Sequence, residues 1–195
     1  KNKTLQILTE KDLLFENNFK LNELTLEERQ LLEERLLISN DPNITAALSF
    51  NDSENRSILI NQHDHFKIKY LCSWEEIEKH YKLINEHDRK IRQHIKFAFD
   101  DKLGYLSASA HRLGSGLKIS LLLSLSSLSL SDEMTSLQKS AIALGLELKA
   151  LDSDSEKPLL WLLHNSCSIG QTEEEILDKA KSFCFQLLEA EKRAL

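Results

Sequence analysis

The sequence has few of the residues that interrupt regular structure: only five of its 195 residues are glycine and two are proline. Long linkers and disordered segments are usually rich in such residues, so this scarcity argues against both. It favours a single domain over residues 1–195, with a helical lead-in over 1–19 and a core from about residue 20. A membrane span is also missing, because the most apolar run, 119–130, is short and broken by five serines.

An excess of basic residues is missing as well. Lysine and arginine total 25 against 31 acidic residues, which gives a net charge of −6. Proteins that bind nucleic acids normally carry a basic stripe, so no nucleic-acid partner is expected. The three cysteines, Cys72, Cys167 and Cys184, lie far apart without metal-ligand spacing. They predict reduced, buried thiols in a cytoplasmic protein and no metal centre. No signal peptide is expected.

The remaining pattern mixes helices with short strands. A helix is expected within Thr9–Asn17, and two more begin at the capping-box pairs Thr25 with Glu28 and Ser73 with Glu76. Later helices are expected over 132–144 and from Thr172 to about Arg193. Strands are expected over 44–50, 57–60, 66–71, 104–109, 117–131, 146–151 and 159–163. Because helices and strands do not alternate strictly, the pattern predicts an α+β fold with an antiparallel sheet flanked by helices.

Four segments, taken in order, resemble one known family. Residues 21–39 are similar to a stretch of protein-arginine kinases that reads about LDELSPLERQALVERHLIS. Residues 57–68, SILINQHDHFKI, resemble the phosphagen-kinase signature V-x-V-N-E-E-D-H-L-R-I. Residues 103–120, LGYLSASAHRLGSGLKIS, resemble RGYLTSCPTNVGTGLRAS, and 145–149, GLELK, resemble the strand GLxVRG. The chain is therefore similar to the catalytic domain of phosphagen kinases (ATP:guanidino phosphotransferases), and within them to bacterial protein-arginine kinases of the McsB type.

The resemblance implies a glutamine-synthetase-like fold, in which helices cover the outer face of an antiparallel sheet. It also implies that ATP, with Mg, lies across the sheet and that arginines hold its phosphates while carboxylates orient the guanidinium. Phosphoryl transfer of this kind depends on positioning and charge stabilisation. The S-x-R-x-R strand of the family would lie upstream of Lys1, and the helical region of McsB-type enzymes would follow Leu195.

The residues that carry the chemistry differ from the family pattern. The two glutamates of N-E-E-D-H are Gln62 and His63 here, followed by Asp64 and His65. A histidine cannot supply the negative charge that a guanidinium needs, although His63 or Asp64 remains a candidate base or substrate contact. The alternative is that His63 is an exposed turn residue of a site that has lost its chemistry.

All three clamp arginines are replaced by lysines, Lys67, Lys118 and Lys149, which with His65 are the candidate phosphate contacts. Lysine keeps the charge but loses the bidentate grip on phosphate oxygens. Losing one preorganised donor costs about 3–4 kcal/mol at the transition state in well-studied enzymes. Each lysine could also be an ordinary exposed strand residue. Glu156 matches the loop glutamate of the family, with simple solubility as its alternative role, and the reactive cysteine of T-S-C-P-T-N is Ser109.

The sequence therefore favours a catalytically impaired protein-arginine-kinase-like domain (a pseudokinase) that acts as a regulatory or binding module. The resemblance suggests an active kinase paralogue or a zinc-binding adaptor as its partner, and a homodimer is also expected. One alternative is an active, divergent guanidino kinase that uses the three lysines as point charges. The other is a scaffold or dimerisation domain without a ligand.

Overall fold

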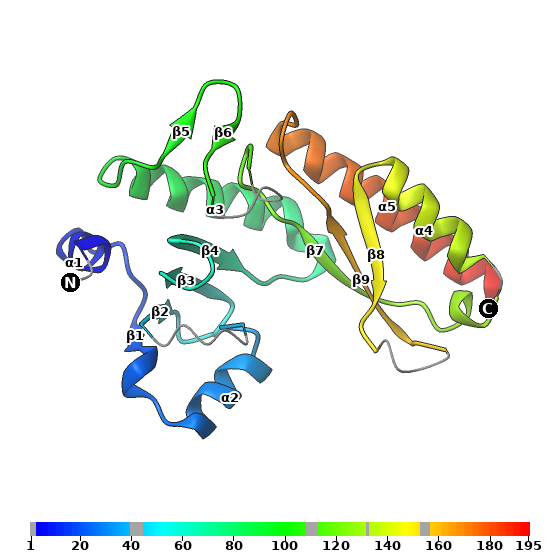
Figure 1. Cartoon of the computed structure of the whole chain (residues 1–195). Helices are drawn as coiled ribbons and strands as arrows, with labels where there is room; N and C mark the ends of the chain where they lie inside the picture. The colour runs from blue at the N-terminus through cyan, green and yellow to red at the C-terminus, as the bar shows by residue number, and fades with distance from the viewer. Residues whose placement is uncertain (1–2, 40–44, 108–112, 132, 153–156) are drawn as a thin grey trace. The chain divides into compact units, whose positions relative to one another are not determined.

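The computed structural model describes residues 3–39, 45–107, 113–131, 133–152 and 157–195. The chain divides into two compact units, Lys1–Phe97 and Ala98–Leu195, and each is described by itself. Figure 1 shows the elements of both units.

The first unit is built on a four-stranded sheet in the order β1-β2-β3-β4, and each neighbouring pair is antiparallel. Its strands are β1 (Asn17–Lys20), β2 (Ala47–Phe50), β3 (Arg56–Ile60) and β4 (Phe66–Tyr70). The β3–β4 register places Leu59 opposite Lys67 and Ser57 opposite Lys69. Successive side chains of a strand point to opposite faces, so these two lysines lie on one face of β4.

Apolar clusters pack on both faces of this sheet. On the face of Lys67 and Lys69, Leu48, Phe50 and Leu59 pack with residues that follow and precede α2 (Leu26–Glu34), including Leu21 and Leu37. On the other face, Ala47, Ile58 and Ile60 pack against Leu8 of α1 (Lys3–Glu10) and Ile91 of α3 (Ile77–Arg92). The short 3₁₀ helices η1 (Leu21–Glu23) and η2 (Trp74–Glu76) precede α2 and α3.

The second unit contains a three-stranded antiparallel sheet in the order β7-β9-β8. These strands are β7 (Ser120–Ser124), β9 (Leu160–Asn165) and β8 (Leu146–Ala150). The helices α4 (Met134–Ala143) and α5 (Glu173–Ala194) lie on one side of it (Figure 1). Side chains on one face, such as Leu123, Trp161, Leu163 and Leu148, are buried, whereas the other face is largely exposed. The described part of this unit also contains a small hairpin, β5 (Phe99–Asp100) with β6 (Gly104–Tyr105), and the 3₁₀ helix η4 (Leu128–Leu130).

The expected α+β class with antiparallel sheets is confirmed. The capping box of Thr25 and Glu28 is present, and Thr172 caps α5 as expected. The helix expected over Thr9–Asn17 is wrong, because α1 ends at Glu10 and Asn17 begins β1. Ser73 makes no capping bond: η2 comes first, and the carboxylate of Glu76 accepts a hydrogen bond from Lys79 instead.

Two further sequence predictions need correction. The strand expected over 117–131 is confined to β7, and residues 128–130 form η4. Of the three cysteines, Cys184 is buried and Cys167 is half-buried, but Cys72 is exposed, so the prediction of buried thiols fails there. Within the described ranges, no helix has both the length and the apolar character that a membrane crossing requires.

Candidate functional site

The signature turn joins β3 to β4 in the first unit. Asn61 opens it in the left-handed region, at φ 57°, a conformation that asparagine tolerates better than most residues. Its backbone N–H donates to the carbonyl of His65 (3.0 Å), and its Oδ1 lies 3.4 Å from Nδ1 of His65. Because Oδ1 can only accept, the Nδ1 of His65 carries the proton in this contact. Two of the three residues that match the signature here, Asn61 and His65, therefore shape the turn.

The residues that replace the two signature glutamates have different surroundings. Gln62 donates from Nε2 to the backbone carbonyl of Ser39 at 2.9 Å, a bond that a glutamate carboxylate could not make. His63 is exposed at the tip of the turn, and Asp64 is half-buried. The position of the first signature glutamate is thus used to tie the turn to the segment after α2.

Lys67 and Lys69 follow on β4, and they differ in burial. Lys67 is exposed, whereas Lys69 is half-buried and donates from Nζ to the carbonyl of Leu36. Burial, and to a smaller degree the charge of Lys67, lowers the pKa of Lys69 to about 8. A second cation, Lys69, therefore lies on the same face as the predicted phosphate contact Lys67, but its ammonium group already binds the carbonyl of Leu36.

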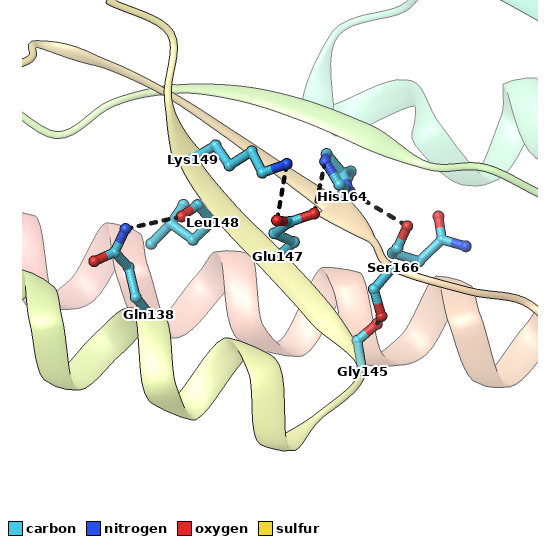
Figure 2. A network of polar contacts seen from close by, with 8 residues as sticks. Gln138, Gly145, Glu147, Leu148, Lys149, His164 and Ser166 are labelled. Carbon is cyan, nitrogen blue, oxygen red and sulfur yellow. Dashed lines mark hydrogen bonds and ion pairs between the residues drawn. The ribbon is translucent and has the colours of Figure 1, made fainter. Parts of the chain in front are cut away.

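The other two predicted clamp lysines both belong to the second unit. Lys149 Nζ lies 2.8 Å from Oε1 of Glu147, two residues earlier on the same face of β8 (Figure 2). The β8–β9 register sets His164 opposite Glu147, and its Nε2 lies 3.5 Å from Oε2 of Glu147. Lys118 acts electrostatically on the same carboxylate. Lys149 and His164 therefore contact one carboxylate on the exposed face of the sheet, and the charge of Lys118 also acts on it.

The electrostatics of this cluster favour the ionised carboxylate. The hydrogen bond from Lys149 lowers the pKa of Glu147, and the charges of Lys149, His164 and Lys118 act in the same direction against partial desolvation. A bound phosphate would make the same kind of contact with Lys149 as Glu147 does. The cluster could accept an anion only in competition with its own carboxylate.

Apolar side chains share this face with the cluster. The register places Leu122 of β7 and Lys149 of β8 on either side of Leu162, which lies on the central strand β9. Leu122 is 58% exposed and Leu160, one step further along β9 on the same face, is 41% exposed. Exposed leucine side chains therefore lie beside Lys149 on this face of the sheet.

The segment that leads to Lys118 depends on glycine. Gly114 has φ 112°, and an added Cβ would lie 2.4 Å from the carbonyl oxygen of Ser168. No larger residue fits between these backbones without displacing one of them. The close approach of Gly114 to the backbone of Ser168 and Ile169 thus explains why a glycine stands at this position.

The predicted site residues fall into two groups. His63, Asp64, His65 and Lys67 belong to one hairpin of the first unit, and Lys118 and Lys149 belong to the second unit. Glu156 lies outside the described residues, as does Ser109. Among the residues the structure describes, no group of three or more His, Cys, Asp or Glu side chains is arranged to hold a metal ion.

His87, in the first unit, forms hydrogen bonds through both of its ring nitrogens. His87 Nε2 lies 3.1 Å from the carbonyl of Leu13, to which it must donate, so Nδ1 accepts from the hydroxyl of Tyr70, also at 3.1 Å. Burial lowers the pKa of His87, and the charges of Lys90 and Arg56 act in the same direction, against the hydrogen bond to Leu13. Both ring nitrogens therefore have structural partners, and His87 is not a candidate base.

Sequence reasoning missed Glu147, His164 and Lys69. For Glu147 a signal was present: it stands two residues from Lys149 in a predicted strand, and such residues share a face. His164 gave no local signal, because only the β8–β9 register brings it to Glu147. The importance of Lys69 rests on its contact with Leu36, which is distant in the sequence.

Comparison with known proteins agrees with this architecture. Residues 2–194 match the model of the family described as ATP:guanido phosphotransferase, C-terminal catalytic domain. A protein-arginine kinase of Clostridium botulinum is 30% identical over 168 residues, which is 85% of this chain and 49% of that protein. One of Bacillus cereus is 30% identical over 199 residues, 99% of this chain and 54% of that protein. The chain thus spans about half the length of these relatives.

Solved structures show the same fold at lower sequence identity. The duplicated taurocyamine kinase of Schistosoma mansoni, with bound transition-state-analog components, has a TM-score of 0.81 at 19% identity and covers 96% of this chain and 29% of its own. Lombricine kinase has a TM-score of 0.81 at 16% identity, over 98% of this chain and 59% of its own. With a family match over nearly its whole length, the chain belongs to the ATP:guanido phosphotransferase family and corresponds to its C-terminal catalytic domain.

Proposed function

We propose that this chain is a protein-arginine-kinase-like domain that binds nucleotide phosphates weakly, transfers phosphoryl groups poorly or not at all, and acts as a regulatory or binding module. The observation that carries the proposal is the pairing of Lys149 with Glu147 at 2.8 Å. A cation expected to hold phosphate is neutralised by its own strand neighbour. The bond from Gln62 to Ser39 supports the same conclusion, since it gives a former acid position a structural role.

The physical reason concerns both ends of the reaction. The γ-phosphoryl group needs preorganised cations, and the guanidinium needs an anion that orients it. Lysines offer single-point contacts in place of forked ones, and one of them is already paired. Asp64 is the only carboxylate left in the signature turn. The fold of the family is kept, whereas the binding of the phosphoryl group by cations and the binding of the guanidinium by a carboxylate are both weakened.

Transfer of labelled phosphate from ATP to an arginine-containing protein tests the proposal, with the Bacillus cereus protein-arginine kinase as positive control. We expect no transfer above background from the wild-type chain. Lys118→Arg with Lys149→Arg should tighten Mg-ATP binding without restoring transfer, and adding Gln62→Glu and His63→Glu should be needed before transfer is detected. Wild-type turnover at ordinary kinase rates, about 1–100 per second, would refute the proposal.

A divergent but active guanidino kinase is the second candidate, and the gathering of Lys118 and Lys149 around Glu147 beside the leucines of the open face favours it. In that case Lys118→Ala abolishes transfer with almost no change in thermal stability, since Lys118 is exposed. A scaffold without ligand is distinguished by its melting temperature. Saturating ATP at 100 times Kd adds about 2.7 kcal/mol of stability, whereas a scaffold shows no shift.

The partner follows from the regulatory role and is part of the proposal. The candidate partners are an active kinase paralogue, a zinc-binding adaptor and a second copy of this chain. The chain would bind each of them through contacts of its surface and not through a catalysed reaction. Size-exclusion chromatography with light scattering, alone and with each partner, separates these three. If the chain stays monomeric and binds neither, the regulatory role is excluded and only the weak nucleotide site remains.

A further inference from the structure

Asn165, at the end of β9, makes three side-chain hydrogen bonds to the backbone. Its Oδ1 accepts from the N–H of Ile119 at 2.8 Å, and its Nδ2 donates to the carbonyls of Leu117 (3.0 Å) and Cys167 (3.2 Å). The side chain is buried, with 7% of the residue exposed. Its two ends therefore grip the backbone on both sides of Lys118.

A second tie holds the start of the same segment. Ser168 Oγ donates to the carbonyl of Leu113 at 2.9 Å, and Ser168 forms an isolated bridge with Gly114. Hydrogen bonds thus attach both ends of the stretch 113–119 to the stretch 165–168, although the two stretches are distant in the sequence. Between the ties, Gly116 has φ 75° and open space around it, so local conformational preference alone does not fix the path of the chain to Lys118.

We infer that Asn165 is a positioning residue: by holding Leu117 and Ile119 it fixes where the Lys118 ammonium lies relative to the Glu147–Lys149 pair. The inference rests on the proposed phosphate-binding role of Lys118. Lysine makes a point contact on a flexible stem, so the direction in which its backbone leaves the sheet decides whether its ammonium reaches the site. Small displacements of a positioned group are known to reduce binding and catalysis steeply.

Asn165 also links the Glu147–His164 contact to the backbone around Lys118. Its neighbour His164 lies across from Glu147 in the β8–β9 register, and the carbonyl of Asn165 lies 3.3 Å from Nδ1 of His164. One short stretch of β9 therefore sets His164 beside Glu147 and sets the backbone of Lys118 through its side chain. Loss of the carboxamide would release Lys118 and leave the Glu147–Lys149 pair, which lies within β8, in place.

A double-mutant cycle tests this role, with Mg-ATP affinity measured by isothermal titration calorimetry for the wild type, Lys118→Ala, Asn165→Leu and the double variant. Each single change should weaken binding by about tenfold, and the double variant should bind no more weakly than either single one. Hydrogen exchange should rise in 113–119 while β9 and α5 stay protected, which shows that the variant is folded. If Asn165→Leu fails to fold, Asn165→Ser replaces it, since serine is smaller, uncharged and too short to keep both backbone bonds.

The matched control is Ser129→Ala, beyond the opposite end of β7. It removes a half-buried hydroxyl that lies within hydrogen-bond distance of the carbonyls of Leu125 and Pro158 and accepts from Nε1 of Trp161. It should lower stability and leave Mg-ATP affinity unchanged. A folded Asn165 variant that binds like the wild type, or effects that add in full, would overturn the inference and leave the phosphate site standing. A wild type that does not bind Mg-ATP, or a Lys118→Ala variant that binds equally well, would instead overturn the proposed site itself, and the inference with it.

Discussion

Replacing Glu147 with glutamine should tighten the binding of nucleotide phosphates. The carboxylate lies 2.8 Å from Lys149 Nζ and is partly exposed, so it competes directly with an incoming phosphate. Glutamine keeps the size and removes the charge. Because exposed ion pairs contribute only about 0–1 kcal/mol, the stability of the protein should hardly change.

The size of the gain follows from the geometry. A phosphate oxygen bound to Lys149 would lie about 5 Å from the carboxylate, where two unit charges in water repel by about 0.8 kcal/mol. For a dianionic phosphate this amounts to about fifteenfold in affinity at low salt, and to about fivefold at 0.15 M salt because of screening. The gain should therefore shrink as the salt concentration is raised.

Isothermal titration with Mg-ATP at two salt concentrations measures both effects. Glu189→Gln is the matched control, since Glu189 pairs with Lys192 at 2.9 Å on the surface of α5 and its loss changes the net charge equally. Affinity should rise in Glu147→Gln and stay unchanged in Glu189→Gln. If the two variants bind ATP equally, or if Glu147→Gln binds more weakly than the wild type, then Glu147 does not compete with phosphate.

Three further predictions concern stability, each measured by urea unfolding. Glu191→Ala should cost about 2–4 kcal/mol, because its carboxylate accepts from the backbone N–H groups of Ser127 (2.8 Å) and Leu128 (2.9 Å), which would lose their partner; an unchanged midpoint would contradict this. Leu36→Gly should raise the free energy of unfolding by about 1 kcal/mol, since the exposed Leu36 has φ 58°, a backbone conformation that glycine adopts without strain. A lower free energy of unfolding would show that the contacts of the leucine side chain outweigh the backbone strain. Lys69, with a pKa of about 8 against an ordinary 10.5, binds fewer protons folded than unfolded between these values. The unfolding free energy should therefore rise with pH through that window by up to about 1 kcal/mol, given partial exposure, and Lys69→Met should remove the rise; equal slopes in both proteins would refute it.

The features that the sequence predicted well depend on short-range chemistry. The capping box of Thr25 and Glu28 closes within one helical turn, so its two residues carry all the necessary information. The alternation of Phe66, Lys67 and Ile68 likewise placed β4 and its lysine face. The fold class followed from the order of such local elements and was confirmed.

The predictions that failed needed contacts between distant segments. Leu13 and Phe15 were assigned to a helix, but they pack on the first sheet, and Asn17 pairs with Phe50. The left-handed Asp12, at φ 53°, ends the helix before them. The strand expected to continue past Ser124 stops because the carboxylate of Glu191, on α5, takes the backbone N–H groups of Ser127 and Leu128.

The candidate site shows the same division. The sequence located Lys118 and Lys149 by resemblance, but their electrostatic setting depends on Glu147, on the cross-strand His164 and on the hold of Asn165. Registers between strands decide which side chains face one another, and no single segment of the sequence specifies them. Whether a retained cation is available to a ligand could therefore be judged only from the structure.

The change from arginine to lysine and the presence of Glu147 act together. A guanidinium has five N–H donors, so an arginine at position 149 could satisfy Glu147 and still hold a phosphate, whereas an ammonium has three donors on one nitrogen and shares them poorly. Lys149→Arg should therefore raise Mg-ATP affinity more in the wild type, where Glu147 competes, than in Glu147→Gln, where it does not. A double-mutant cycle by calorimetry measures this coupling, and equal gains in both backgrounds would show that the two residues affect phosphate binding independently.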